Sequence, residues 1–164
     1  MSVFETVSEA DRDEVARQLG RAPRAMRAVA HRCPSGHPTV VQTSPRLPTG
    51  EPFPTLYYLT CRQLAKLISK LESGGVMDEM TRRLGEDPEL AAAYLAAHES
   101  YLVERDAIET LGTQVTAGGM PGRVKCLHAL VAHSLAVGRG VNPFGDEALD
   151  LLAGQWPGGS CTAG

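Results

Sequence analysis

The sequence contains no apolar run long enough to cross a membrane as a helix. Arginine or glutamate interrupts every candidate well before the ~20 apolar residues that a span requires. The first residues, MSVFETVSEADRDE, are acidic and lack the apolar centre of a secretory signal. We therefore expect a cytoplasmic protein with no membrane partner. In that reducing compartment the four cysteines, Cys33, Cys61, Cys126 and Cys161, should be core residues, metal ligands or reactive thiols.

Familiar catalytic signatures are absent as well. The sequence has no G-x-x-x-x-G-K-[ST] loop, no G-x-G-x-x-G and no G-x-S-x-G. His98 and Glu99 do not begin the H-E-x-x-H motif of zinc proteases, because the fifth residue is Leu102. The cysteines form no dense motif, which favours zinc over an iron–sulfur cluster at any metal site.

Acidic side chains are missing from residues 15–50, a segment that holds six arginines. Residues 72–109, in contrast, hold ten acidic residues and three arginines. This division has two interpretations: the two segments dock on each other, or the arginine-rich N-terminal third binds an acidic protein partner. One basic segment in a chain of net charge −3 argues against nucleic acid as a partner.

The pattern of periodic and turn-forming segments predicts an α+β fold. We expect residues 1–154 to form a single globular domain and residues 155–164 a disordered tail. A small N-terminal antiparallel sheet of about three strands should pack against a mainly helical C-terminal two-thirds. The expected strands are 25–33, 39–43 and 55–60, and the expected helices are 8–19, 60–72, 78–84, 87–111, 121–137 and 146–152.

Two cysteines occupy positions where a thiol can bind a metal or react. In HRCPSGHP, a tight turn should bring Cys33 and His37 to the same side, a spacing found in metal knuckles. Thr60 and Gln63 have the pattern of a capping box, which places Cys61 in the first turn of a helix. The helix dipole there would stabilise a thiolate. For Cys61 the alternative is a buried core residue at a strand–helix junction.

The stretch RVKCLHALVAH, residues 123–133, places a cysteine and two histidines on a predicted helix. On an intact helix Cys126 and His128 point about 200° apart and cannot bind one ion, whereas Cys126 and His133 share a face at a separation of about 10 Å. That face equally fits a core stripe. We predict a zinc site in which Cys33, Cys61 and Cys126 converge, with His128 or His133 as the fourth ligand.

The glycine-rich segment TAGGMPGRVK, just before this helix, predicts a different site. Gly118 and Gly119 would let a ligand approach the backbone near a helix N-terminus, and Arg123 and Lys125 would add positive charge. A small anionic ligand that carries a phosphate or a carboxylate fits this arrangement. The alternative is an ordinary glycine-rich connection that leads into the helix.

Three long phrases of the sequence are distinctive: RCPSGHPTVVQTSPRLPTGEPFPTLYYLTC, RLGEDPELAAAYLAAHESYL and AGGMPGRVKCLHALVAHSLAVGRGVNPFGDEAL. Together they resemble a bacterial family named domain of unknown function 501, and the chain looks like an actinobacterial member. The likeness extends roughly from Leu19 to Leu152. This resemblance implies an uncharacterised protein and brings no established activity with it.

Three functions therefore stay open. The first is a protein that binds zinc through cysteine and histidine. The second is a protein or enzyme for a phosphorylated or carboxylated ligand, with His98 or His128 as acid or base. The third is a non-catalytic interaction module that uses the arginine-rich N-terminal third. Sensitivity to a chelator, stabilisation by phosphate and salt-sensitive association would separate them.

Overall fold

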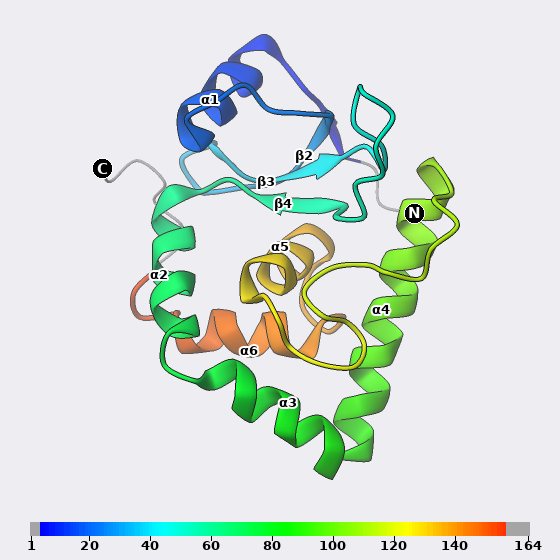
Figure 1. The fold of residues 1–164 in the computed structure, drawn as a ribbon. Coiled ribbons are helices and arrows are strands. Elements are labelled where there is room, and N and C mark those ends of the chain that lie inside the picture. Colours follow the sequence, from blue (N-terminus) through cyan, green and yellow to red (C-terminus); the bar gives the residue numbers. More distant parts are fainter. Residues whose placement is uncertain (1–3, 157–164) are drawn as a thin grey trace.

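The computed structural model of the protein describes residues 4–156. In that range the chain forms one four-stranded antiparallel sheet and six helices, so the predicted α+β fold is confirmed (Figure 1). The strands, in their order across the sheet, are β1 (Glu5–Thr6), β2 (Met26–Arg32), β3 (Pro38–Thr43) and β4 (Tyr57–Leu59). The helices are α1 (Glu9–Leu19), α2 (Arg62–Glu72), α3 (Val76–Glu86), α4 (Pro88–Ile108), α5 (Leu127–Val137) and α6 (Pro143–Leu151). None of these helices combines the length and the apolar character that crossing a membrane requires.

Local capping signals explain where α1 and α4 begin. Ser8 and Asp11 form the predicted capping box of α1, in which each side chain accepts a hydrogen bond from the other's backbone N–H, at 3.1 and 3.2 Å. Asp87 caps α4 by accepting a hydrogen bond from the N–H of Glu89 at 3.1 Å, and Pro88 takes the first helical position. Both starts agree with the prediction.

The starts of α2 and α5 differ from the prediction. The N-cap of α2 is Cys61 rather than Thr60, so Cys61 precedes the first helical turn. Helix α5 begins at Leu127 rather than near residue 121, and its N-cap, Cys126, has an extended backbone (φ −149°, ψ 109°). The residues just before Cys126 form an irregular loop instead of a helical turn. This later start changes the direction in which the Cys126 side chain points.

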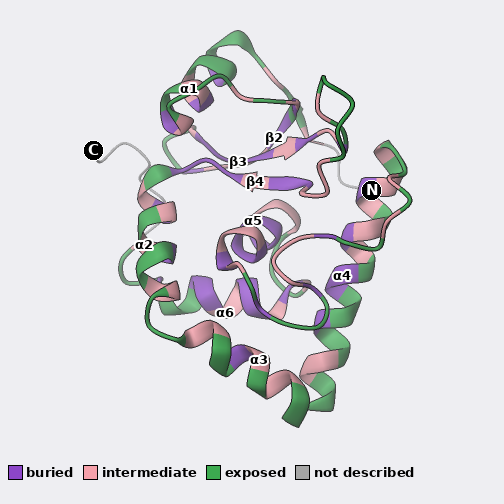
Figure 2. Cartoon of the chain, in the orientation of Figure 1, coloured by how far each residue is buried: buried purple, intermediate pink, exposed green. Residues whose placement is uncertain are grey.

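One face of the sheet, the inner face, packs against α5. Val40, Tyr57 and Leu59 are buried on this face, and α5 contacts β2, β3 and β4. Helices α2, α4 and α6 surround α5, and α3 lies at the end remote from the sheet (Figure 1). Buried residues are concentrated along α5 and the strands above it, where Leu127 and Leu130 are fully buried (Figure 2). Burial of this apolar surface is the main stabilising contribution to the fold.

Among the described helices, α1 is the one that covers the opposite face of the sheet, the outer face (Figure 1). Val15 of α1 is fully buried against Met26, Val29 and Val41, which form a second and much smaller core. The alternation of side chains along β3 explains this division, because Val40 points to the inner face and the adjacent Val41 to the outer face.

A buried arginine holds the long loop between α4 and α5. Arg105 of α4 is fully buried, and its guanidinium donates hydrogen bonds to the carbonyls of Thr113 (2.8 Å), Val115 and Pro54 (3.4 Å). These carbonyls replace the water that the charge loses on burial. The loop therefore has a defined path that ends at Cys126.

The predicted C-terminal tail falls mostly outside the described residues. Residues 157–164, which include Cys161, belong to the part that the structure does not describe. The backbone N–H groups of Gln155 and Trp156 both donate to the carbonyl of Leu152, at 2.9 Å. These two residues of the predicted tail therefore continue the turn that follows α6.

Candidate functional site

The end of α2 and the start of α5 lie side by side, and this contact brings three reactive side chains together. Glu72 is the last residue of α2, and its Oε2 accepts a hydrogen bond from the backbone N–H of Leu127 at 2.8 Å. A carboxylate is well placed there, since the N–H groups in the first turn of a helix have no partner within the helix. Glu72 therefore stabilises the start of α5 from a neighbouring helix.

Cys126 and His128 meet at this helix start. The Cys126 Sγ lies 4.0 Å from the Nδ1 of His128, although the two were expected to point about 200° apart on an intact helix. That expectation is wrong because Cys126 is the N-cap, and its extended backbone releases the side chain from the helical spacing. The pair thus depends on α5 beginning at Leu127.

His128 is held by contacts on both of its ring nitrogens. Its Nε2 lies 3.1 Å from the carbonyl oxygen of Ala65 and 3.2 Å from the hydroxyl of Ser69, both on α2. Its Nδ1 lies 3.2 Å from the Oε2 of Glu72. A carbonyl only accepts hydrogen bonds, so the Ala65 contact places a proton on Nε2. The Nδ1 atom then faces the Glu72 oxygen and the Cys126 sulfur with an electron pair, unless a cation or a proton lies between them.

When a proton lies between the Cys126 sulfur and the His128 Nδ1, the surroundings favour a negative charge on the sulfur and a positive charge on the imidazole. Burial opposes ionisation of the Cys126 thiol, but contact with His128 and the backbone N–H of Ala129 outweigh it and lower the thiol pKa. The sulfur of Cys126 raises the pKa of His128 to about 9; burial opposes this rise and the charge of Glu72 adds to it. Without a metal, the lowered thiol pKa and the raised imidazole pKa shift the pair toward a thiolate beside an imidazolium.

Glu72, Cys126 and His128 are the one group of three potential metal ligands in the described residues whose ligand atoms all lie within 4.8 Å of one another. Two of the five predicted zinc ligands belong to it, and Glu72 was not among them. Cys33, Cys61 and His133 lie outside this group.

Cys33, Cys61 and His133 lie in three different environments. Cys33 lies in the turn between β2 and β3, where its Sγ is 3.8 Å from the Nδ1 of His37; the turn thus brings these two side chains together as expected. Cys61 is fully buried in the main core. His133 is fully buried between aromatic rings, and its Nδ1 lies 3.1 Å from the amide nitrogen of Asn142. Burial lowers the pKa of His133 to about 4, so its imidazole is neutral.

The predicted anion site lies on the loop that leads to Cys126, but its glycines have a structural explanation. Gly118 and Gly119 have positive φ angles of 68° and 92°. A Cβ on Gly118 would lie 2.6 Å from the Leu130 side chain, and one on Gly119 would lie 2.7 Å from the carbonyl oxygen of Arg123. Only glycine fits these positions. Since α5 begins at Leu127, the two glycines also do not lie directly before a helix N-terminus.

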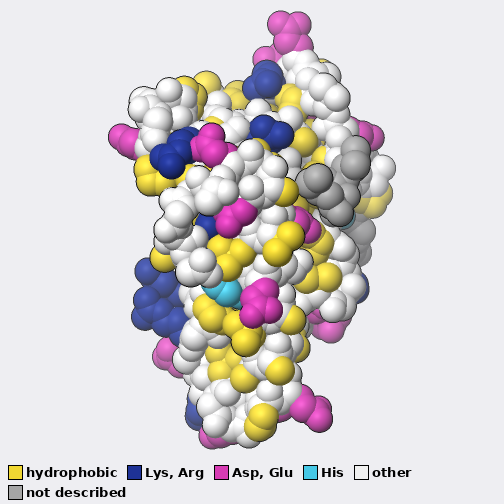
Figure 3. Space-filling view, turned by 90° about the vertical axis from the view of Figure 1, so that its right-hand side faces the viewer, with side chains coloured by type: hydrophobic (Ala, Val, Ile, Leu, Met, Phe, Trp, Pro, Cys, Tyr) yellow, Lys and Arg dark blue, Asp and Glu magenta, His cyan; other side chains and the backbone are white. Residues whose placement is uncertain are grey.

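The same loop nevertheless borders a wide, open cavity of about 970 Å³. Arg123 and Lys125 are exposed at its wall, and the partly buried Cys126 also lines it. His98, the other predicted acid or base, is a nearly buried part of the wall, where its Nδ1 lies 2.9 Å from the Thr116 hydroxyl and burial lowers its pKa. Figure 3, which faces the side of α4, shows lysine and arginine side chains gathered at one edge of this view. The charged residues of the cavity wall are cationic.

A second cavity, of about 520 Å³, also borders Cys126. Its wall includes Tyr58, Arg62 and His128. Cys126 and Ala129 line both cavities. Cys126 therefore borders both cavities and His128 the smaller one, whereas Glu72 is not among the described residues that line either.

A family model for proteins of unknown function, DUF501, matches residues 29–150. The chain belongs to the DUF501 family. The residues of this chain that match the DUF501 model include Glu72, Cys126 and His128, whereas β1 and α1 precede the matched range. The resemblance seen in the sequence is thus confirmed at the level of the family. Neither a curated protein nor a solved structure matches the chain.

Sequence reasoning missed Glu72 in this DUF501 member. Glu72 and Leu127 are 55 positions apart, and no spacing rule connects the end of one helix to the start of another at that distance. The glutamate precedes Ser73 and two glycines, which is the pattern of an ordinary helix end. No local signal in the sequence points to its role.

Proposed function

We propose that the protein binds a zinc ion through Glu72, Cys126 and His128. The observation that supports this proposal is the orientation of His128. Its Nε2 faces the carbonyl oxygen of Ala65 at 3.1 Å, which leaves Nδ1 to face the Cys126 sulfur and the Glu72 carboxylate. Three electron-rich atoms that face one another are a favourable site for a cation.

The chemistry of the ligand set fits zinc. Thiolate, imidazole and carboxylate are all zinc ligands, and a soft sulfur beside a nitrogen disfavours magnesium and calcium. Histidine ligands of zinc usually donate their other N–H to a carbonyl or carboxylate, as His128 does to Ala65. The Leu127 N–H fixes the Glu72 oxygen in the same way. Both ligands therefore have the outer contacts that zinc sites use.

Three protein ligands leave a fourth position open, which is typical of catalytic rather than structural zinc sites. Cys126 lines both cavities and His128 lines the smaller one, which supports access of water or a ligand to that position. Of the described residues that line the larger cavity, Arg123 and Lys125 are the only ones with a fully charged side chain, which favours an anionic ligand. Stabilisation by phosphate at constant ionic strength, lost in Arg123→Gln, would support this ligand class.

In a second candidate function, a proton rather than a metal ion lies between Cys126 and His128, and Cys126 acts as a nucleophile. The lowered pKa of the Cys126 thiol and the raised pKa of His128 favour a thiolate–imidazolium pair, which is the ground state of a nucleophilic cysteine. In that case Cys126 would react with an electrophilic ligand in one of the adjoining cavities. The two candidates exclude each other, because zinc bound to the sulfur would suppress its reactivity.

Elemental analysis of protein purified without a tag separates the candidates. We expect about one zinc per chain in the wild-type protein and in Cys33→Ser, which removes a thiol outside the group, and none in Cys126→Ser. Zinc that persists in Cys126→Ser would contradict the proposed site. Folded wild-type protein without metal, whose Cys126 reacts with iodoacetamide faster than an ordinary thiol at pH 7, would favour the nucleophile instead.

A further inference from the structure

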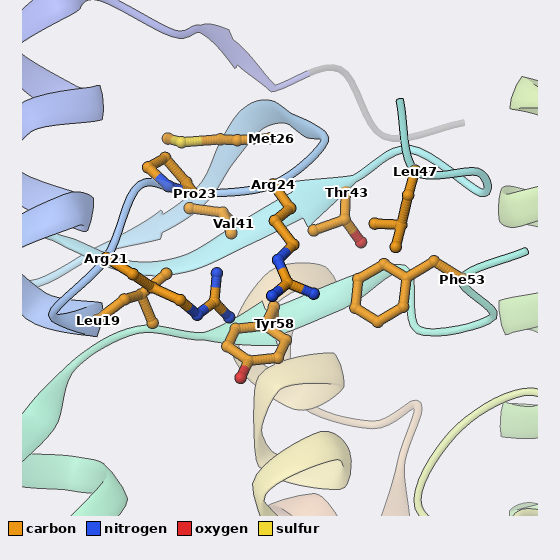
Figure 4. Close-up of a pocket in the computed structure, with 10 residues that line it drawn as sticks. All are labelled: Leu19, Arg21, Pro23, Arg24, Met26, Val41, Thr43, Leu47, Phe53 and Tyr58. Atoms are coloured by element: carbon orange, nitrogen blue, oxygen red, sulfur yellow. The ribbon is translucent and has the colours of Figure 1, made fainter. Parts of the chain in front are cut away.

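The outer face of the sheet is not fully covered by α1, and a cavity of about 170 Å³ lies beside that helix. Figure 4 shows it between the segment that joins α1 to β2 and the strands β3 and β4. Its apolar wall comes from α1, the strands and the loop after β3, and consists of Leu19, Met26, Val41, Leu47, Phe53 and Tyr58. A cavity of this size is comparable to one that holds a benzene molecule.

Two arginines lie over this apolar wall. The side chains of Arg21 and Arg24 both extend toward Tyr58 (Figure 4). Arg21 donates to the carbonyl of Ala22 at 3.3 Å, and within residues 4–156 neither arginine has an acidic partner. Among the described residues, the cavity wall contains no acidic side chain. This corner of the protein is therefore both apolar and positively charged.

The other arginines of residues 15–50 show that the lack of acidic partners is mostly restricted to this part of the segment. Arg17 pairs with Glu14 at 2.6 Å, Arg32 with Asp11 at 2.9 Å, and Arg46 with Glu109 at 2.6 Å. The three without an ion pair in the described range are Arg21, Arg24 and Arg27. Two of those three line the cavity. In the described range, the unpaired positive charge of residues 15–50 is thus concentrated at this cavity, with Arg27 as the exception.

The backbone next to Arg24 has an unusual conformation. Ala25 has a φ of 51°, the one positive value at a non-glycine residue in the described range. Residues with a Cβ rarely adopt this region. The carbonyl of Ala25 accepts a hydrogen bond from the N–H of Ser44 at 2.8 Å, which fixes the start of β2 against the end of β3. The backbone next to Arg24 is therefore held against β3 by a hydrogen bond, so Arg24 does not lie on an unattached loop.

We propose that this cavity binds a carboxylate that is attached to a single aromatic or branched apolar group. Arginine presents a planar fork of N–H donors that matches a carboxylate, and two such forks surround the mouth of the cavity. The apolar wall receives the rest of the ligand. The same chemistry occurs in a free small carboxylate and in the C-terminal residue of a peptide.

The cavity adjoins the metal site without depending on it. Leu19 and Tyr58 also line the cavity of about 520 Å³ that contains Cys126 and His128. A longer ligand anchored by its carboxylate at Arg24 would run from there along the edge strand β4 toward Cys126. The proposed carboxylate site stands on its own residues, so it survives even if no zinc is bound.

Titration with phenylacetate, followed by isothermal calorimetry at fixed ionic strength, tests this proposal. We expect a dissociation constant on the order of 1 mM for the wild-type protein and binding about tenfold weaker in Arg24→Gln and in Arg21→Gln. Arg27→Gln is the matched control, because this exposed arginine has no ion pair in the described range and does not line the cavity. It should bind as the wild-type protein does.

Neutral analogues and a peptide complete the test. Phenylacetamide should bind at least about tenfold more weakly than phenylacetate, because it lacks the charge. Equal binding of amide and acid, equal loss in Arg27→Gln, or no binding at 10 mM phenylacetate and at 10 mM tripeptide would each overturn the proposal. Acetyl-Ala-Ala-Phe with a free carboxylate identifies the source: tighter binding than phenylacetate indicates a peptide C-terminus, and weaker binding a free small carboxylate.

Discussion

The two faces of the sheet are built from the same strands but have different roles. On the inner face, Val40, Tyr57 and Leu59 pack against a fully buried segment of α5, and the core continues through four more helices. On the outer face, Val41 and Tyr58, the next residues along the same strands, meet one short helix and a cavity. The inner face stabilises the fold and fixes the start of α5, whereas the outer face leaves space for a ligand.

The largest difference should appear when buried side chains are truncated. Leu130→Ala on α5 removes a fully buried side chain from the inner core, and we expect a loss of about 3–4 kcal/mol in the free energy of unfolding. Val41→Ala on the outer face should cost only about 1–2 kcal/mol, because it borders an existing cavity. Urea unfolding of both variants measures the two values, and similar losses would contradict the division into a large and a small core.

Acid should destabilise the inner face first. His133 is neutral in the folded protein because burial lowers its pKa to about 4, whereas in the unfolded chain it takes up a proton near pH 6.5. The unfolded state therefore binds more protons below pH 6.5, and stability should fall by about 3 kcal/mol between pH 6.5 and 4. In His133→Gln this fall should shrink; an unchanged pH dependence in the variant would show that another group titrates.

The outer face should respond at lower pH and more weakly. The Arg32 guanidinium, with burial opposing, lowers the pKa of Asp11 from 3.8 to about 2. Asp11 thus contributes stability above pH 4 that is lost as the pH falls toward 2. We expect about 1 kcal/mol, because the Arg32 side chain is 28% exposed and water weakens the pair. Asp11→Asn, compared with the wild-type protein by thermal unfolding at pH 7 and pH 2.5, should lose clearly more stability at pH 7 than at pH 2.5, where the stabilisation by Asp11 is already partly lost.

The smallest effect should come from the ion pair between the two oppositely charged segments. Arg46 and Glu109 are 2.6 Å apart, but both side chains are more than 40% exposed. Arg46→Gln should therefore change the free energy of unfolding by no more than about 0.5 kcal/mol. A loss several times larger would mean that docking of the arginine-rich segment on the acidic one contributes to the fold, in addition to the two sheet faces.

The sequence was informative where local rules operate. The Ser8 capping box, the Asp87 cap of α4 and the turn that joins Cys33 to His37 each involve residues within four positions of one another. These features depend on short-range hydrogen bonds, so their residue types predict them directly. The α+β class followed from the same local patterns.

The site could not be predicted because its geometry depends on distant residues. Pro121 favours a helix start locally, but residues 118–122 form turns, and the N–H of Lys125 donates to the carbonyl of Gly118 at 2.7 Å, so α5 begins only at Leu127. That delay makes Cys126 an N-cap and turns its sulfur toward His128. Glu72 joins them from the end of α2 through the N–H of Leu127. Neither contact leaves a spacing that is visible in the sequence.

The proposed zinc site is tested most directly by X-ray absorption at the zinc edge on the purified protein. We predict one sulfur ligand at about 2.3 Å and the remaining ligands, nitrogen or oxygen, at about 2.0–2.2 Å. This pattern corresponds to Cys126, His128, Glu72 and one further ligand from the cavity. A protein that carries no zinc, or a spectrum with two or more sulfur ligands, would contradict the assignment of the site to these three residues.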